Sequence, residues 1–184
     1  LYSPLDLNSS EIRLIRILRL EAGPSRINGP PIVHCRLEHQ FLSQNPTYEA
    51  LSYAWGSPKR PRTIFLNDRP IRVTKGLEAA LRQFASEIRD AKESPLLWVD
   101  ALCINQRDDK EKSQQVTQMA RIYSNAKQVL IWLGRESDDS SLAMETLDWL
   151  HGMYETALES LTGRAWFRRI WVIQEVTLSK IATV

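Results

Sequence analysis

Residues 96–134 read LLWVDALCINQRDDKEKSQQVTQMARIYSNAKQVLIWLG, and this stretch decides the fold class. It begins with the apolar run 96–99 and ends with the apolar run 128–133, which Gly134 closes. Continuous apolar runs of this length are typical of strands buried on both faces of a sheet. An apolar stripe at helical spacing lies between them. The stretch therefore predicts a strand–helix–strand unit, with the right-handed crossover that such units adopt.

The helix inside this unit carries a start signal. Asp108 followed three residues later by Glu111 is a variant capping box, with Asp in the place that Ser or Thr usually takes. The apolar residues that predict its buried face are Val116, Met119, Ala120 and Tyr123.

The N-terminal part of the chain predicts strands. Residues 11–20 favour a strand over a helix, because a Gly-Pro turn and a second strand-like run at 32–37 follow them. We also expect a strand over 48–54 and a short hairpin over 64–73 that turns at Asn67-Asp68.

Three more helices are predicted from the same helical spacing. One follows Thr74 as its N-cap, and the others cover 141–155 and 165–178. The stripe of the first consists of Leu77, Ala80, Leu81, Phe84, Ala85 and Ile88. Together the elements predict one α/β domain over 1–184, with a tail over 1–10. We expect a parallel core sheet with helices on both faces and an antiparallel strand extension at the N-terminus.

Composition and charge exclude several classes of function. Hydrophobic residues make up 43% of the chain, as in globular and not disordered proteins. The 24 basic and 22 acidic residues leave a net charge of +2, which disfavours a nucleic-acid partner. No apolar run approaches the roughly 18 residues of a membrane span, so we expect no membrane partner. Two cysteines cannot build a disulfide framework, which favours the reducing cytoplasm. The first residue is not Met, so we expect a piece of a longer chain.

Polar and glycine positions gather where the predicted strands end. Trp55 and Gly56 follow one strand, and Asp100 begins a segment that runs on through Asn105 and Gln106. These positions are candidate ligand contacts, because ligands of parallel sheets bind outside the carboxyl ends of the strands. For Asp100 the pattern leaves two roles open, which are contact with a ribose hydroxyl or metal and capping of nearby backbone amides.

Tryptophan and one carboxylate add further candidates. Trp55 and Trp132 either pack in the core or present a ring on which a base or nicotinamide stacks. Glu175 lies in an otherwise apolar segment. It is therefore either paired with Arg168 or Arg169, or held at a pocket mouth with a shifted pKa.

The residue pattern offers little support for a metal site, for a nucleophilic cysteine or for a phosphate-binding loop. His34 and Cys35 point to opposite faces of a strand, and no ligand pair has zinc spacing. Cys103 has no evident base beside it in the sequence, and no glycine-rich phosphate loop occurs. The basic cluster over 59–62 is either a solvated loop or a contact for phosphate or a partner.

Three long segments, taken in order, resemble those of one family. They read YEALSYAWG at 48–56, LWVDALCINQ through VLIWLG over 97–134, and RAWFRRIWVIQEV at 164–176. Over about residues 11–180 the chain resembles the fungal heterokaryon-incompatibility (HET) domain. The resemblance implies a cytoplasmic fungal protein that triggers programmed cell death after non-self recognition, a form of innate immunity. It also implies upstream sensor or NLR-type partner domains.

The HET family is in turn viewed as a distant relative of Toll/interleukin-1 receptor (TIR) domains, which implies a TIR/flavodoxin-like core sheet. Trp171 and Glu175 have the Trp-to-Glu spacing of the catalytic motif in enzymatic TIR domains. Val172 stands where those domains have a cysteine, and the predicted helix at about 137–163 is an extra element. The relation to TIR domains is therefore an analogy.

This resemblance implies an NAD hydrolase that self-associates, with NAD as substrate and no cofactor or metal. Glu175 would be the catalytic carboxylate. The residues expected to contact the nucleotide are Trp55, Gly56, Asp100, Asn105, Gln106, Trp132 and Arg168. The alternative is a non-enzymatic signalling module that triggers death by assembling partners. An open cleft with Glu175 and Asp100 favours the enzyme, and a Glu175 sealed in an ion pair favours the module.

Overall fold

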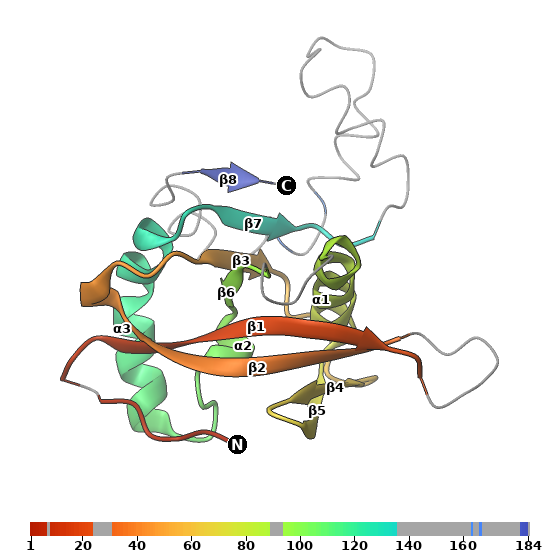
Figure 1. Cartoon of the computed structure of the whole chain (residues 1–184), viewed down its shortest axis with the longest axis horizontal. Helices are drawn as coiled ribbons and strands as arrows, with labels where there is room; N and C mark the ends of the chain where they lie inside the picture. The colour runs from red at the N-terminus through yellow and green to blue at the C-terminus, as the bar shows by residue number, and fades with distance from the viewer. Residues whose placement is uncertain are drawn as a thin grey trace, which may run out of the picture.

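The computed structural model describes residues 1–6, 8–23, 31–88, 94–135, 163, 166 and 181–183 (Figure 1). The strands are β1 (Glu11–Glu21), β2 (Ile32–Phe41), β3 (Glu49–Tyr53), β4 (Arg62–Leu66), β5 (Arg69–Val73), β6 (Leu96–Trp98), β7 (Val129–Trp132) and β8 (Ala182–Thr183). The helices are α1 (Lys75–Glu87), α2 (Asp100–Cys103) and α3 (Asp109–Asn125), with a 3-10 turn at Leu42–Gln44. The predicted helices over 141–155 and 165–178 lie outside the described residues, apart from Trp166.

The strands form one sheet in the order β5-β4-β2-β1-β6-β3-β7-β8. Strands β6, β3, β7 and β8 run parallel to one another, as the sequence predicts for the core. Strand β1 pairs antiparallel with β2 on one side and with β6 on the other. The α/β class is therefore confirmed, and the sheet as a whole is mixed, because the antiparallel N-terminal strands continue its parallel part.

The N-terminal strands are not an appendage at the edge of this sheet. Only ten residues separate β1 from β2, and a connection this short returns a strand antiparallel beside its neighbour. Strand β1 then continues the sheet through its pairing with β6, so it lies in the middle. Its apolar side chains are buried on both faces, as in a central strand.

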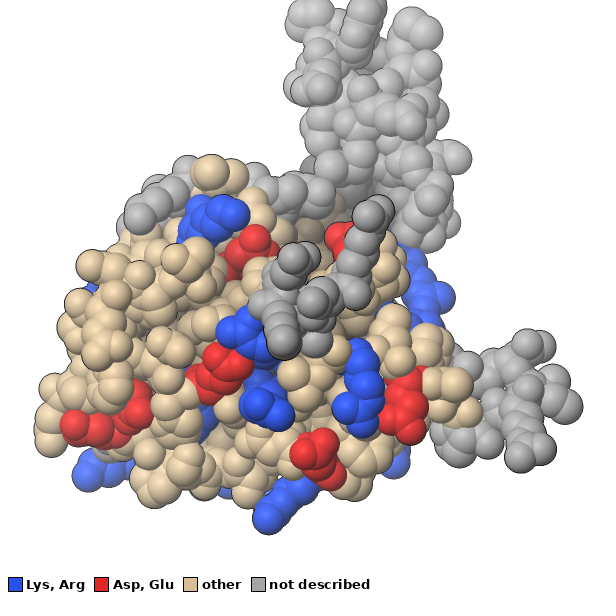
Figure 2. Space-filling model, viewed as in Figure 1, with Lys and Arg blue, Asp and Glu red and all other residues tan. Residues whose placement is uncertain are grey.

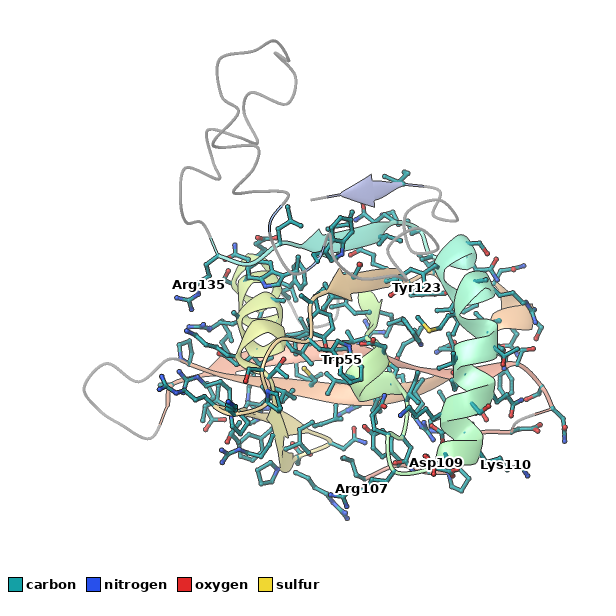
Figure 3. All side chains as sticks on the ribbon, turned by 180° about the vertical axis from the view of Figure 1, so that it is seen from behind. Trp55, Arg107, Asp109, Lys110, Tyr123 and Arg135 are labelled. Carbon is teal, nitrogen blue, oxygen red and sulfur yellow. The ribbon has the colours of Figure 1, made fainter. Side chains whose placement is uncertain are left out.

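The three described helices cover one face of the sheet. Strands β1 and β2 pass in front of them in Figure 1, and the view from behind in Figure 3 shows all three helices in front. Helices α1 and α2 both pack on β1. On the other face, Ser52 of β3 accepts a hydrogen bond from the indole nitrogen of Trp166 at 2.5 Å. Neighbouring Tyr53 points to the helical side. Among the described residues, the expected helices on both faces are thus seen on one face only.

Helix α3 begins as predicted, and its buried side includes Met119 and Tyr123 of the predicted stripe. Val116 is 40% exposed, so this member of the predicted stripe is wrong. The buried positions include the polar residues Glu111 and Gln115, followed by Met119. Gln115 faces the core because its side-chain amide donates to the Glu11 carbonyl at 3.1 Å. The helical spacing of the apolar residues therefore predicted part of the inward side of α3, and buried polar residues complete that side.

Both predicted N-caps are present, and they allow a matched test of stability. Thr74 accepts from Leu77 N at 3.3 Å, while Asp108 accepts from Lys110 N at 3.1 Å and Glu111 N at 3.0 Å. We expect Thr74→Ala to lower the free energy of unfolding by about 1 kcal/mol. Asp108→Ala should cost more, because its carboxylate also meets the positive end of the helix dipole.

Urea unfolding of the purified variants measures this ranking. Thr74→Ser and Asp108→Asn are the matched controls, since each keeps a capping oxygen. Equal stability of wild type and Asp108→Ala would show that this cap contributes nothing.

Charges on the sheet face opposite the helices are of mixed sign. Figure 2 shows Lys and Arg interspersed with Asp and Glu over the face that the viewer sees. Arg16, for example, pairs with Glu38 at 2.7 Å. This face lacks the field of one sign that a nucleic-acid backbone would require. Within the part of the chain that the structure describes, no helix has the length and apolar character of a membrane span.

Candidate functional site

A cavity of about 670 Å³ opens where the parallel strands β3 and β6 end. It lies between the start of α1, the short helix α2 with the loop after it, and β5. Trp55, Asn105 and Gln106 line it, so the structure brings these three predicted residues together. Figure 3 shows Trp55 between α1 and α2, with Arg107 farther out at the edge of the molecule. The volume is that of a site for a small molecule.

Trp55 is held in place by Asp100. Its indole nitrogen donates to Asp100 Oδ2 at 2.9 Å, and Asp100 Oδ1 accepts from Ala101 N at 2.7 Å. Asp100 is 8% exposed, whereas Trp55 is 43% exposed. Asp100 therefore organises the loop, one of the two roles that the sequence left open. The Trp55 ring remains accessible from the cavity.

The segment after α2 is also anchored from within. Gln106 donates its side-chain amide to the Asp100 carbonyl at 3.0 Å, and Asn105 Oδ1 accepts from Arg107 N at 3.3 Å. The backbone N–H of Asn105 donates to Glu111 Oε1 at 2.7 Å. These contacts give the two amide side chains defined positions on the wall of the cavity.

Glu111 does not act as the second half of a capping box, so that part of the sequence interpretation is wrong. Its carboxylate binds Arg13 instead, with N–O distances of 2.6 and 2.9 Å. Arg13 Nη1 also donates to the Cys103 carbonyl at 3.1 Å, and Nη2 to the Ser3 carbonyl at 2.5 Å. This buried pair ties β1, α3 and the Asn105 loop together. Strand β1 carries three arginines, Arg13, Arg16 and Arg19, and no local pattern marks Arg13 as the buried one.

Gly56 contributes to this site through its backbone conformation. Its φ of 68° lies in the left-handed region that favours glycine. It is not among the residues that line the cavity. The predicted contact with a nucleotide thus has no support from its position, and its evident role is the turn that follows Trp55.

Trp132 lies elsewhere. Its ring meets Phe84 edge to face, at 6.4 Å between centroids and 68° between planes. It lines a second cavity of about 680 Å³, together with Arg82 and Arg135. The structure therefore does not bring Trp55 and Trp132 to one ring site. Glu175 and Arg168 lie outside the described residues, and their roles stay predictions.

The two thiols are structural in character. Burial raises the pKa of both Cys35 and Cys103 from the ordinary 9.0 to about 12. Cys103 is the last residue of α2, and Val99 N donates to its sulfur at 3.2 Å. Neither is a thiolate at neutral pH, so neither is suited to nucleophilic attack. Among the described residues, no group of three His, Cys, Asp or Glu side chains has the arrangement of a metal site.

These pKa shifts predict a loss of stability at alkaline pH. Above pH 9 the thiols ionise in the unfolded chain, while the folded protein retains their protons until about pH 12. The unfolded state then binds fewer protons, so the free energy of unfolding falls as the pH rises through this window. Urea midpoints measured between pH 8 and 11 test this. The Cys35→Ala and Cys103→Ala variants should each show a shallower fall, and unchanged slopes would contradict the assignment.

Comparison with known proteins gives one family. Residues 48–175, about two thirds of the chain, match the family described as Heterokaryon incompatibility protein (HET). The chain is 40% identical over 124 residues to heterokaryon incompatibility protein 6, OR allele, of Neurospora crassa. That alignment covers 62% of this chain and only 18% of the relative. No solved structure matches. The matched segment carries the strand ends, Trp55 and the loop that follows α2, and the chain belongs to the heterokaryon-incompatibility (HET) family.

Proposed function

We propose that this domain is a cell-death effector of fungal non-self recognition and acts in the cytoplasm. Membership of the HET family supports the role, as does a Neurospora relative named for heterokaryon incompatibility. Because the chain spans 18% of that relative, the sensor domains that would activate it are part of the proposal. Self-association and a TIR/flavodoxin-like relationship of the core sheet belong to the same proposal.

We further propose that the domain hydrolyses NAD. The bond between nicotinamide N1 and ribose C1′ breaks, and nicotinamide leaves with the bonding electron pair. Water adds to C1′ and loses a proton, so the products are nicotinamide, ADP-ribose and H⁺. The transition state has oxocarbenium character, and a nearby carboxylate stabilises its positive charge. Glu175 is our candidate for that carboxylate.

The observation that carries this proposal is the cavity beside Trp55. It lies at the carboxyl ends of parallel strands, where ligands of α/β sheets bind. An accessible indole ring suits stacking against nicotinamide or adenine, while Asn105 and Gln106 offer amides to ribose hydroxyls. Arg168 remains a candidate phosphate contact from its place in the third family motif.

The test is nicotinamide release from NAD by the purified chain, free and clustered on a scaffold. We expect release by the wild type and a loss of at least about 100-fold in Glu175→Gln, which removes the charge and keeps the shape. Glu87→Gln, an exposed residue at the end of α1, is the matched control and should behave as wild type. Equal rates in wild type and Glu175→Gln would remove Glu175 from catalysis.

The second candidate is a non-enzymatic signalling module. One observation favours it: the carboxylate of Asp100, which binds the cavity residue Trp55, accepts hydrogen bonds from Trp55 Nε1 and Ala101 N. If the domain is a signalling module, the Glu175→Gln variant should still trigger cell death in a fungal host. If it is an enzyme, this variant should have lost that ability. Cell death by Glu175→Gln, together with no nicotinamide release by the clustered wild type, would establish the module.

A further inference from the structure

The charges on the wall of the Trp55 cavity are all of one sign. Two arginines line it, Arg72 from β5 and Arg107 from the loop after α2, and no Asp or Glu does. Neither guanidinium makes an ion pair or side-chain hydrogen bond to any residue that the structure describes. By contrast, Arg16 and Arg82 each meet a carboxylate. The cavity thus combines an accessible aromatic ring with two uncommitted cations.

The surroundings strengthen this positive character. The hairpin of β4 and β5 and the loop before it carry further basic residues: Lys59, Arg60, Arg62 and Arg69. Asp68 at the turn is the hairpin's single carboxylate. Asp100 accepts hydrogen bonds from Trp55 and Ala101, and it makes no ion pair with Arg72 or Arg107. A positive rim raises the local concentration of an anionic ligand and speeds its capture.

We propose that Arg72 and Arg107 bind the phosphate groups of a nucleotide whose ring stacks on Trp55. This assignment deepens the proposed function, on which it rests for the choice of nucleotide. Two guanidinium groups from different elements of the cavity wall suit a diphosphate, because each presents paired donors to phosphate oxygens. The cavity's apolar lining, which includes Pro58, Pro70 and Leu77, suits a flat ring. Its volume of about 670 Å³ fits a small molecule better than a nucleic-acid strand.

The test measures binding of ADP-ribose to the chain by calorimetry, because this ligand has the diphosphate but no bond left for the hydrolase to cleave. We expect Arg72→Gln and Arg107→Gln each to weaken binding about tenfold, and the double variant by more than either. Both side chains are exposed, so the fold should survive, which thermal unfolding checks. Arg36→Gln on β2, an exposed residue outside the cavity and its basic rim, is the matched control.

Two further ligands separate the contributions of phosphate and ring. Adenosine, which lacks phosphate, should bind more weakly and be insensitive to the arginine substitutions. Inorganic phosphate should bind weakly and lose its binding in the double variant. No binding of ADP-ribose by the wild type, or equal binding by the double variant, would overturn the assignment. A single-stranded RNA is the competing ligand. If it bound more tightly than ADP-ribose, and Arg69→Gln weakened its binding as much as Arg72→Gln or Arg107→Gln, the arginines would belong to a nucleic-acid surface instead.

The same variants distinguish this inference from the hydrolase. If ADP-ribose binding depends on the two arginines but no nicotinamide is released, the phosphate-binding site is supported and the proposed NAD hydrolysis is contradicted. If the double variant releases nicotinamide with an unchanged KM for NAD, the proposed hydrolysis is supported and the assignment of Arg72 and Arg107 to phosphate binding is contradicted.

Discussion

Arg13→Met is expected to lower the free energy of unfolding by about 3–5 kcal/mol, the usual cost of breaking a buried ion pair. The Arg13 side chain is fully buried, and it binds the Glu111 carboxylate and two backbone carbonyls. Its removal leaves Glu111 charged and buried without a partner cation. Glu111→Leu should cost a similar amount, because it strands the Arg13 charge and the Asn105 N–H. Urea unfolding of both variants measures these losses.

The double variant Arg13→Met, Glu111→Leu separates the charge from the hydrogen bonds. Replacing a buried ion pair by apolar residues is often neutral. Here the Cys103 carbonyl and the Asn105 N–H would still lose partners, at about 1–3 kcal/mol for each buried group. We therefore expect only partial recovery. A matched control is Arg16→Met, whose pair with Glu38 is partly exposed and should contribute about 1 kcal/mol or less. A loss for Arg13→Met no larger than this would contradict the role of the buried pair.

Trp98→Ala should cost about 3–5 kcal/mol as well, for a different reason. Trp98 is fully buried in β6, and its ring meets Tyr123 of α3 edge to face, at 5.5 Å between centroids and 77° between planes. Alanine would leave a cavity between the sheet and α3, which a packed interior fills only in part. The measurement is again the free energy of unfolding, read from urea titration.

Trp98→Phe is the informative control. The indole nitrogen has no hydrogen-bond partner among the described residues, so phenylalanine removes volume but no described bond. We expect it to cost clearly less than alanine, since an aromatic ring still meets Tyr123. A loss as large as that of Trp98→Ala would mean that the indole N–H has a partner beyond the described part of the chain.

Much of the local structure was predictable from the sequence, because its causes lie within a few residues of each other. The hairpin turn shows this: Asn67 and Asp68 both have positive φ, which these residue types tolerate and tight hairpins require. The Thr74 cap depends on an amide three residues away, and the buried strands on runs of adjacent apolar residues. The family also follows from local motifs, which explains why the HET assignment was possible without coordinates.

The site was predictable only in part. Strand ends identify where a ligand binds in an α/β sheet, and Trp55, Asn105 and Gln106 do line one cavity there. No sequence pattern marks Arg72 or Arg107 as site residues. Arg72 reaches the cavity through the pairing of β5 with β4, which no local pattern reveals. Trp132 lies at the end of a predicted strand and Trp55 directly follows one, yet α1 lies beside Trp132, which faces a second cavity.

By itself the sequence determined the α/β class, most element positions, the caps and the family, since periodicity and short motifs are properties of neighbouring residues. Only the tertiary structure decided that β1 lies in the middle of a mixed sheet and that Arg13 meets Glu111, 98 positions away. It also decided which polar residues of α3 face inward. These features depend on which distant segments pack together, and that is set by burial and pairing over the whole fold.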